Sequence, residues 1–459
     1  MVDYPIPGYP VVNYTATDGI MELLRYQQNY PALGTGQQVL ATQARNLLGT
    51  IPQVFVEYQT KYQFNLFGDY PFKKDIVPSA VFVGVYGILL ILHLLIFILN
   101  MSRGHYFWIT LTYIFYCACK IVGFACRIVW QRDLSITAIG LTSEVLLIIP
   151  TIILVSFNLI LAQRIFTWRH PVGGSRKLFW GIMFGFYGFV LGIVAMTIMA
   201  SFVPYLHMLS QANYEKYIKV QQAAAILVVL YPFTAVSLIG LSYFFKPTRK
   251  DENLYTYQPY WIESFHPFYF VKKNASKEAE ETFMKRNHNH RHAVRVIAAT
   301  HHHYNMVQGL TNERGDLTHN MSLIIVSIST FVLFVGSLCR CIVVFQANYQ
   351  KDSSAICSPI AMYIIWGAAE ALVVLMYAVG RVDLRFYRPD RLPKKVRAII
   401  TAEQSIEQSE EELSDEEFDD DVRTSDLSEL SFNNYKLPSY EDQFRREHEK
   451  EDNQSEFHF

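Results

Sequence analysis

The sequence has none of the common signatures of catalysis. Its 459 residues contain no P-loop, no G-x-S-x-G and no H-E-x-x-H. Charged residues make up only 18%, and the formal net charge is -1. The basic residues stand beside apolar stretches instead of forming a patch for nucleic acid. We therefore expect a protein that is not an enzyme, uses no cofactor and binds no nucleic acid.

Two further absences concern targeting and cysteine. The first 75 residues contain no apolar signal-peptide core, so we expect the first spanning helix to act as its own insertion signal. The six cysteines fit no zinc spacing, and five of them fall inside apolar stretches. An oxidising exterior would allow one disulfide, Cys126–Cys357.

The dominant feature that is present is seven long apolar stretches. A hydrocarbon core of ~30 Å needs about 20 helical residues to cross it. Lipid offers the backbone no hydrogen bonds, so each stretch must be a helix. The sequence therefore predicts an all-α, polytopic membrane protein, a bundle of seven transmembrane helices at about 78–99, 106–128, 136–163, 178–203, 222–245, 322–345 and 359–380.

Lysine and arginine set the orientation, because they are enriched in cytoplasmic loops. They are denser after the third, fifth and seventh stretches, which places the N-terminus outside and the C-terminus in the cytosol. The predicted parts are an extracytoplasmic segment (1–77), a transmembrane domain (78–381) with a cytosolic loop (246–321), and a disordered acidic tail (382–459). Asn13 begins a glycosylation sequon in the outer segment.

Five lysine, arginine or glutamate residues lie inside the predicted helices, where charge is costly and therefore indicates function. These residues are Lys120, Arg127, Glu144, Arg340 and Glu370. One interpretation is a polar cavity in the outer half that binds the headgroup of an amphiphile. The other is a set of internal salt bridges that only lock the bundle. At ~1.5 Å per residue, Lys120 and Glu144 reach similar depths, which predicts a Lys120–Glu144 pair.

The acidic tail carries two regulatory signals. Ser409 and Ser414 each precede three acidic residues, as sites of acidophilic kinases do. Leu437-Pro438-Ser439-Tyr440 resembles the ligand of WW domains in HECT-type ubiquitin ligases, since Pro438 favours an extended segment that fits an aromatic groove. These motifs predict a surface protein whose endocytosis is controlled by phosphorylation and ubiquitination.

Histidines cluster at 288–292 and 301–303 without accompanying cysteines or carboxylates. This pattern favours a solvated basic loop, and we expect no metal site.

The order of motifs in the helices resembles the fungal seven-spanning lipid-translocating exporter family, which is linked to resistance against toxic amphiphiles. The resemblance rests on CKIVGFACRIVW (119–130), on the stretch from Glu144 to Phe166, on LCRCIVVFQANY (338–349) and on the stretch from Glu370 to Pro389. The matching positions are Gly123, Arg127, Pro150, Arg164, Arg340, Glu370 and Tyr377. The chain departs from the family at Lys120, where a Glu is usual, and at Asn158, where a Tyr is usual.

The resemblance implies translocation of lipids or amphiphiles, or resistance to toxic amphiphiles, with membrane lipids or amphiphilic small molecules as partners. We expect the protein in the plasma membrane or in an internal membrane. Seven helices, a long third cytosolic loop and a phosphorylatable tail also fit a receptor or sensor. A membrane scaffold without ligand flux is a third alternative.

Overall fold

A computed structural model of the chain describes residues 25–170, 177–246 and 320–386, together with Gly19, Leu23, Gly173, Phe268, Phe270 and Lys273. The chain divides into two compact units, 1–393 and 394–459, and all described residues belong to the first. The described residues are helical apart from turns, short connections and one isolated β-bridge.

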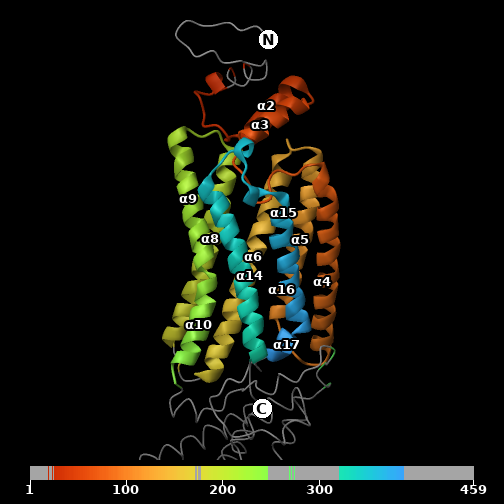
Figure 1. Cartoon of the computed structure of the whole chain (residues 1–459), viewed down its shortest axis with the longest axis vertical. Helices are drawn as coiled ribbons and strands as arrows, with labels where there is room; N and C mark the ends of the chain where they lie inside the picture. Colours follow the sequence, from red (N-terminus) through yellow and green to blue (C-terminus); the bar gives the residue numbers. More distant parts are fainter. Residues whose placement is uncertain are drawn as a thin grey trace, which may run out of the picture. The chain divides into compact units, whose positions relative to one another are not determined.

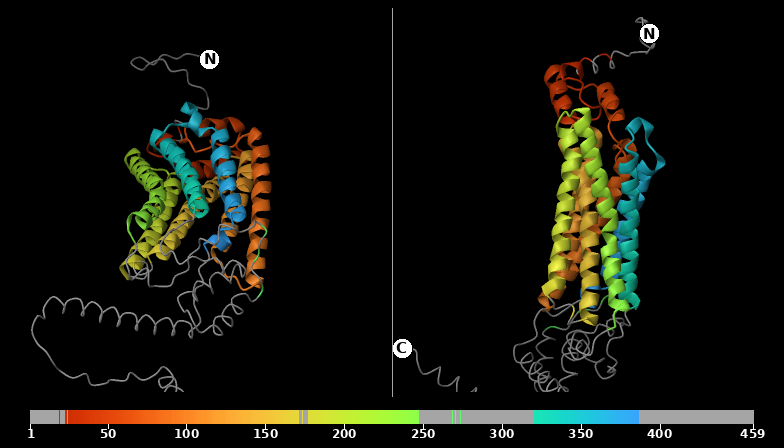
Figure 2. Two further views of the ribbon diagram at one scale, coloured as in Figure 1. Left: turned by 60° about the horizontal axis from the view of Figure 1, so that its bottom comes forward. Right: turned by 90° about the vertical axis from the view of Figure 1, so that its left-hand side faces the viewer.

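Seven helical segments in the described residues are long and apolar enough to cross a membrane, and they run side by side (Figures 1 and 2). Each matches a predicted stretch, because a chain in lipid can satisfy its backbone only within a helix. The multi-pass helical fold is therefore confirmed. The seven segments are α4 (Ile76–Ser102), α5 (Ile109–Arg132), α6 (Thr137–Arg169), α8 (Lys177–Leu206), α9 (Gln211–Leu230) with α10 (Pro232–Phe244), α14 (Asn320–Gln346), and α15 (Pro359–Met362) with η6 (Tyr363–Ala369) and α16 (Glu370–Val379).

Two spans are interrupted. Pro232 is the first residue of α10, where its missing N–H costs no hydrogen bond, and it divides the fifth span. The seventh span contains the π-helix η6, a geometry that is rare and often found at functional sites. The hydroxyl of Tyr86 donates to the carbonyls of Trp366 and Gly367, at 2.9 and 3.0 Å, and so satisfies acceptors in the π-helix.

The end of the bundle that carries α2 (Gln37–Leu48) and α3 (Gln53–Lys61) is here called the capped end (Figure 1). Residues 62–75, here called the linker, connect α3 to α4 and include the short helix η1 (Lys73–Asp75). The Phe64 ring stacks between the rings of Tyr214 and Tyr349, with centroids 5.2 and 5.3 Å away. These contacts hold the linker against the first turn of α9 and against the loop that follows α14.

The opposite end, here called the tail end, is closed by a buried polar cluster around Asp383 of α17 (Val382–Arg385). Asn100 Nδ2 donates to Asp383 Oδ2 at 2.7 Å, and Arg381 Nη2 donates to the same oxygen at 2.7 Å. Burial opposes ionisation of Asp383, but the hydrogen bonds and charge of Arg381 prevail and lower the pKa of this carboxyl. His105 lies 2.8 Å from the Asp383 carbonyl oxygen, and burial lowers its pKa to about 4.

Candidate functional site

Three of the five charged residues predicted within the helices form internal bonds. Lys120 Nζ lies 2.8 Å from Glu370 Oε2 and donates to the Leu147 carbonyl at 3.0 Å. Glu370 also accepts hydrogen bonds from the hydroxyls of Tyr116, at 2.5 Å, and Thr151, at 2.7 Å. Lys120 and Glu370 are 0% and 1% exposed, so this cluster is sealed inside the bundle.

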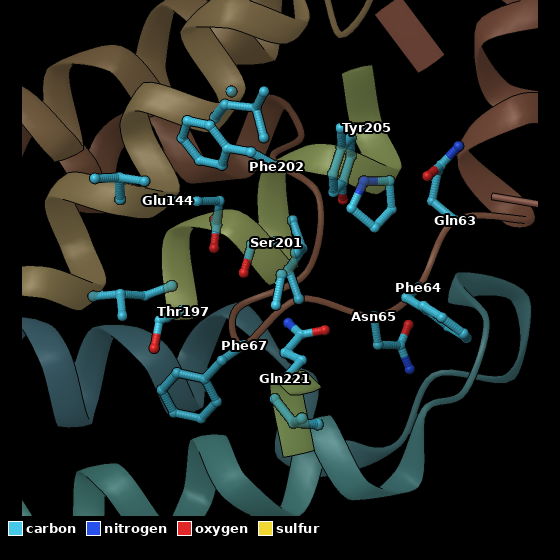
Figure 3. Close-up of a pocket in the computed structure, with 18 of the residues that line it drawn as sticks. Gln63, Phe64, Asn65, Phe67, Glu144, Thr197, Ser201, Phe202, Tyr205 and Gln221 are labelled. Carbon is cyan, nitrogen blue, oxygen red and sulfur yellow. The ribbon is translucent and has the colours of Figure 1, made fainter. Parts of the chain in front are cut away.

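The predicted Lys120–Glu144 pair is therefore wrong. The two residues have similar depths, but depth does not fix the direction in which a side chain leaves its helix. On α5, Lys120 points toward α16, where Glu370 receives its charge. Glu144, one turn before Leu147 on α6, points instead into a cavity at the capped end (Figure 3).

Arg127 holds the linker to α5. Its guanidinium donates to the carbonyls of Gly68 and Asp69, at 2.5 and 3.0 Å, and to Asp75 Oδ2 at 3.0 Å. Gly68 has φ +102°, a left-handed conformation that glycine adopts without strain. The Tyr70 hydroxyl bonds the Tyr205 hydroxyl and ties the linker to α8 as well. Arg127 thus positions the roof of the cavity.

The cavity lies beneath the linker, between α6, α8, α9 and α14, and its volume is about 100 Å³. A single water needs roughly 10–15 Å³ on the same measure, so the space holds several waters or a small polar group. Figure 3 shows Gln63, Phe64, Asn65 and Phe67 of the linker across the cavity from Glu144 and Ser201.

Glu144 and Arg340 both line this cavity at the same level. Glu144 is seven residues from the capped-end start of α6, and Arg340 is six residues from the capped-end finish of α14. At ~1.5 Å rise per residue these positions correspond to depths of about 10 and 9 Å. The two charges therefore face one space from different helices.

Both charges are buried, and neither forms an ion pair with another described side chain. Glu144 is 9% and Arg340 7% exposed. Glu144 Oε1 has no hydrogen-bond partner, and neither residue takes part in the salt bridges that the described side chains form. Arg127 and Arg340 both act electrostatically on Glu144, and Arg340 lines the same cavity as Glu144. A buried charge without a partner is costly and indicates a site that water or a ligand completes.

Other unsatisfied polar atoms gather around the same space. Four cavity-lining residues carry buried side-chain atoms without a partner in the described part of the chain: Gln37 Oε1, Gln63 Nε2, Asn65 Oδ1 and Nδ2, and Thr197 Oγ1. Buried polar groups are nearly always hydrogen-bonded in proteins, and each exception requires an explanation. Their common location is explained if the cavity receives a polar molecule.

Below the level of the charges most of the lining residues are apolar, with Thr197 of α8 and Gln221 of α9 as polar exceptions. Ile148 and Ile149 follow Glu144 by one turn of α6, and Ile198 lies on α8 one turn deeper than Phe202. Trp366 lines the cavity too, and its ring centroid is 5.5 Å from Lys120 Nζ. Trp366 therefore separates the cavity from the sealed ion pair. A polar upper part above an apolar floor suits an amphiphilic molecule.

Several predicted residues lie outside the described part of the chain. They are the glycosylation site Asn13, the phosphorylation sites Ser409 and Ser414, and the WW-domain ligand Leu437, Pro438 and Tyr440. The histidine clusters and most of the cytosolic loop are outside it as well. These remain predictions.

The predicted disulfide is not formed, because Cys126 and Cys357 are both free cysteines. Cys357 is buried in the connection before α15, where its backbone carbonyl accepts from the Gly68 amide at 3.1 Å. Cys126 lies on α5, where it behaves as a small half-buried apolar residue.

Sequence reasoning missed the linker as a part of the site. Gln63 and Asn65 stand in a polar segment that resembles any other outer loop, and Asp75 precedes the first apolar stretch without a distinguishing pattern. One signal was available. A buried Arg127 near the end of a span requires an acceptor, and Asp69 and Asp75 are the acidic residues next to the first span.

Part of the chain is similar to a known protein family. Residues 171–387 match a family model described as "Protein of unknown function (DUF3112)", which covers less than half of the chain. The matched range runs from before α8 to the end of α17, and it includes Arg340 and Glu370 but not Glu144. No curated protein and no solved structure matches the chain. The match thus includes four of the seven apolar spans of this chain.

Proposed function

We propose that this membrane protein binds the headgroup of a lipid or other amphiphile in the capped-end cavity and moves it across the membrane. The observation that carries the proposal is the pair of buried, unpaired charges, Glu144 and Arg340, above an apolar floor. The resemblance to lipid-translocating exporters adds support. Of the five residues expected to meet the headgroup, the proposal keeps these two and assigns Lys120, Arg127 and Glu370 to the framework.

The proposal places the cavity on the extracytoplasmic side, following the distribution of lysine and arginine in the sequence. Lipid headgroups lie at that level, since the two charges are only about 10 Å inside the helix ends. Seven apolar helices favour a membrane location, and the acidic tail with its WW-domain ligand favours the plasma membrane. The proposal involves binding and movement alone, so it requires no catalytic group.

A flux measurement tests this proposal. The purified protein is reconstituted into liposomes that contain a fluorescent phospholipid, and the loss of fluorescence with external dithionite reports transbilayer movement. We expect Glu144→Gln and Arg340→Gln to lower the rate about tenfold, because each removes one charged contact of the headgroup. Lys216→Gln is the control, since Lys216 is an exposed charge on α9 that lies outside the cavity. Equal rates in all four proteins and in empty liposomes would contradict translocation.

The alternative function is that of a receptor or sensor that binds an amphiphile without moving it. One observation favours it. Below the cavity, Asn158 of α6 accepts from Tyr377 and Ser329, at 2.7 and 3.1 Å, and donates to Thr330 at 3.1 Å. This network packs three helices together in the tail-end half. A sensor predicts ligand binding without flux, and deletion of residues 403–459 would abolish its signalling.

A further inference from the structure

Two opposite charges face the cavity from different helices and do not form an ion pair with each other. Glu144 projects from α6 and Arg340 from α14, and the two helices pack against each other. Arg127, the other arginine that acts on Glu144, is already bonded to Asp75 and to the linker carbonyls. The cavity therefore presents one free negative and one free positive group, and its formal charge is balanced.

The balance of charge restricts the ligand. A cationic amphiphile would satisfy Glu144 and leave Arg340 buried without an anion, and an anionic amphiphile would do the reverse. Removing one partner from a buried charge pair is strongly unfavourable, because the remaining charge has lost its hydration. A molecule with both charges satisfies the two side chains together.

The neutral polar groups are arranged to complete such a site. Gln63 Nε2 and Asn65 Nδ2 are donors without a partner, and Asn65 Oδ1 is an acceptor without one. Both residues belong to the linker that forms the roof, across the cavity from Glu144 (Figure 3). An anionic group with several oxygens, such as a phosphodiester, can accept from these donors while it pairs with Arg340.

We infer that the ligand is a zwitterionic amphiphile, with its cationic group at Glu144 and its phosphate or carboxylate at Arg340. The inference rests on the proposed function and specifies its substrate class. The apolar floor formed by Ile148, Ile149 and Trp366 receives the first part of the chain. The shared chemistry is one positive and one negative group near each other, as in the headgroups of phosphocholine and phosphoethanolamine lipids.

Three probes with the same alkyl chain separate the headgroup from the tail. They are dodecylphosphocholine, which is zwitterionic, dodecyltrimethylammonium, which is cationic, and dodecyl phosphate, which is anionic. Each is titrated into the full-length protein in a nonionic maltoside detergent, at mole fractions that leave the micelle unchanged. Tryptophan fluorescence reports binding, because Trp130 and Trp366 line the cavity. We expect the zwitterionic probe to bind about tenfold more tightly than either of the others.

Two variants give opposite results if the inference is correct. Glu144→Gln leaves Arg340 alone, so dodecyl phosphate becomes the tightest probe. Arg340→Gln leaves Glu144 alone, so dodecyltrimethylammonium becomes the tightest. A variant that had lost its fold would bind all three probes more weakly. It would not make one of the singly charged probes the tightest ligand. Lys216→Gln should keep the order of the wild type.

The binding results separate an error in the charge of the ligand from the absence of amphiphile binding. If a singly charged probe binds the wild type as tightly as the zwitterionic one, or if the variants keep the wild-type order, the zwitterionic ligand is refuted while amphiphile binding stands. If none of the three probes binds, water alone satisfies Glu144 and Arg340, and the proposed function fails with the inference.

Discussion

Lys120 Nζ lies 2.8 Å from Glu370 Oε2, and this ion pair joins α5 to α16 in the interior of the bundle. Tyr116 and Thr151 donate to the same carboxylate, so its oxygens are satisfied by three side chains from α5 and α6. The pair neutralises the two deepest charges. It thereby leaves Glu144, nearer the capped end, as the buried carboxylate that faces the cavity.

We first predict that Glu370→Gln destabilises the protein although it preserves the shape of the side chain. The substitution leaves the Lys120 ammonium buried without its counter-charge, which typically costs about 3–5 kcal/mol. The melting temperature of the purified protein in detergent should fall clearly. A companion variant, Lys120→Met with Glu370→Leu, removes both charges and should recover most of the loss. An unchanged melting temperature for Glu370→Gln would show that the ion pair is not needed.

The second prediction concerns the π-helix. A Cβ on Gly367 would lie 2.6 Å from the Phe82 ring, closer than side chains approach each other. We expect Gly367→Ala to displace Phe82 and to cost about 1–3 kcal/mol, as overpacking does. Gly185→Ala on α8 is the matched control, because no atom lies within 4 Å of its added Cβ. Thermal unfolding of the two variants should differ, and equal melting temperatures would contradict the close approach.

The third prediction concerns Asn158, the residue that joins α6 to α14 and α16. Asn158→Leu removes the acceptor of the buried Tyr377 hydroxyl and the donor to the Thr330 hydroxyl, whereas Ser329 keeps its bond to the Val326 carbonyl. We expect a loss of about 1–3 kcal/mol in stability, measured by unfolding in increasing denaturing detergent. Tyr377→Phe removes a single hydroxyl from the same network and should cost less. A larger loss of stability in Tyr377→Phe than in Asn158→Leu would show that Asn158 is not the centre of this network.

The fourth prediction is a pH dependence at the tail end. Burial lowers the pKa of His105 to about 4 from an ordinary value of 6.5. Between these two values the unfolded chain binds a proton that the folded protein does not bind, so stability decreases as pH falls from 6.5 toward 4. The full effect of this shift is about 3 kcal/mol.

His105→Asn tests this dependence, because asparagine does not titrate. Unfolding of the wild type and the variant is measured at several values between pH 4 and pH 7. The stability difference between them should change in favour of the variant as pH falls. A difference that stays constant over this range would contradict the assignment of the effect to His105.

The helices could be predicted from the sequence because lipid admits few alternatives for the backbone. The division of the fifth span at Pro232 follows from the chemistry of proline, which has no backbone N–H to donate within a helix. The Lys120–Glu370 pair was not predictable, because its formation depends on the rotation of α5 and α16 about their axes. The π-helix that precedes Glu370 changes this rotation, and no residue in YIIWGAA marks it.

The cavity was partly predictable. Glu144 and Arg340 were identified as costly charges in the outer half, and both line it. The linker that roofs it depends on contacts between residues far apart in the chain, such as Phe64 with Tyr349. Such contacts leave no periodic pattern in a polar segment, so the sequence did not reveal them.

The most direct test of the central claim is an experimental structure of the full-length protein with dodecylphosphocholine. We expect the headgroup to lie beneath the linker, with its ammonium beside Glu144 and its phosphate beside Arg340. A structure in which Glu144 and Arg340 form a direct ion pair, with only water in the remaining space, would contradict it.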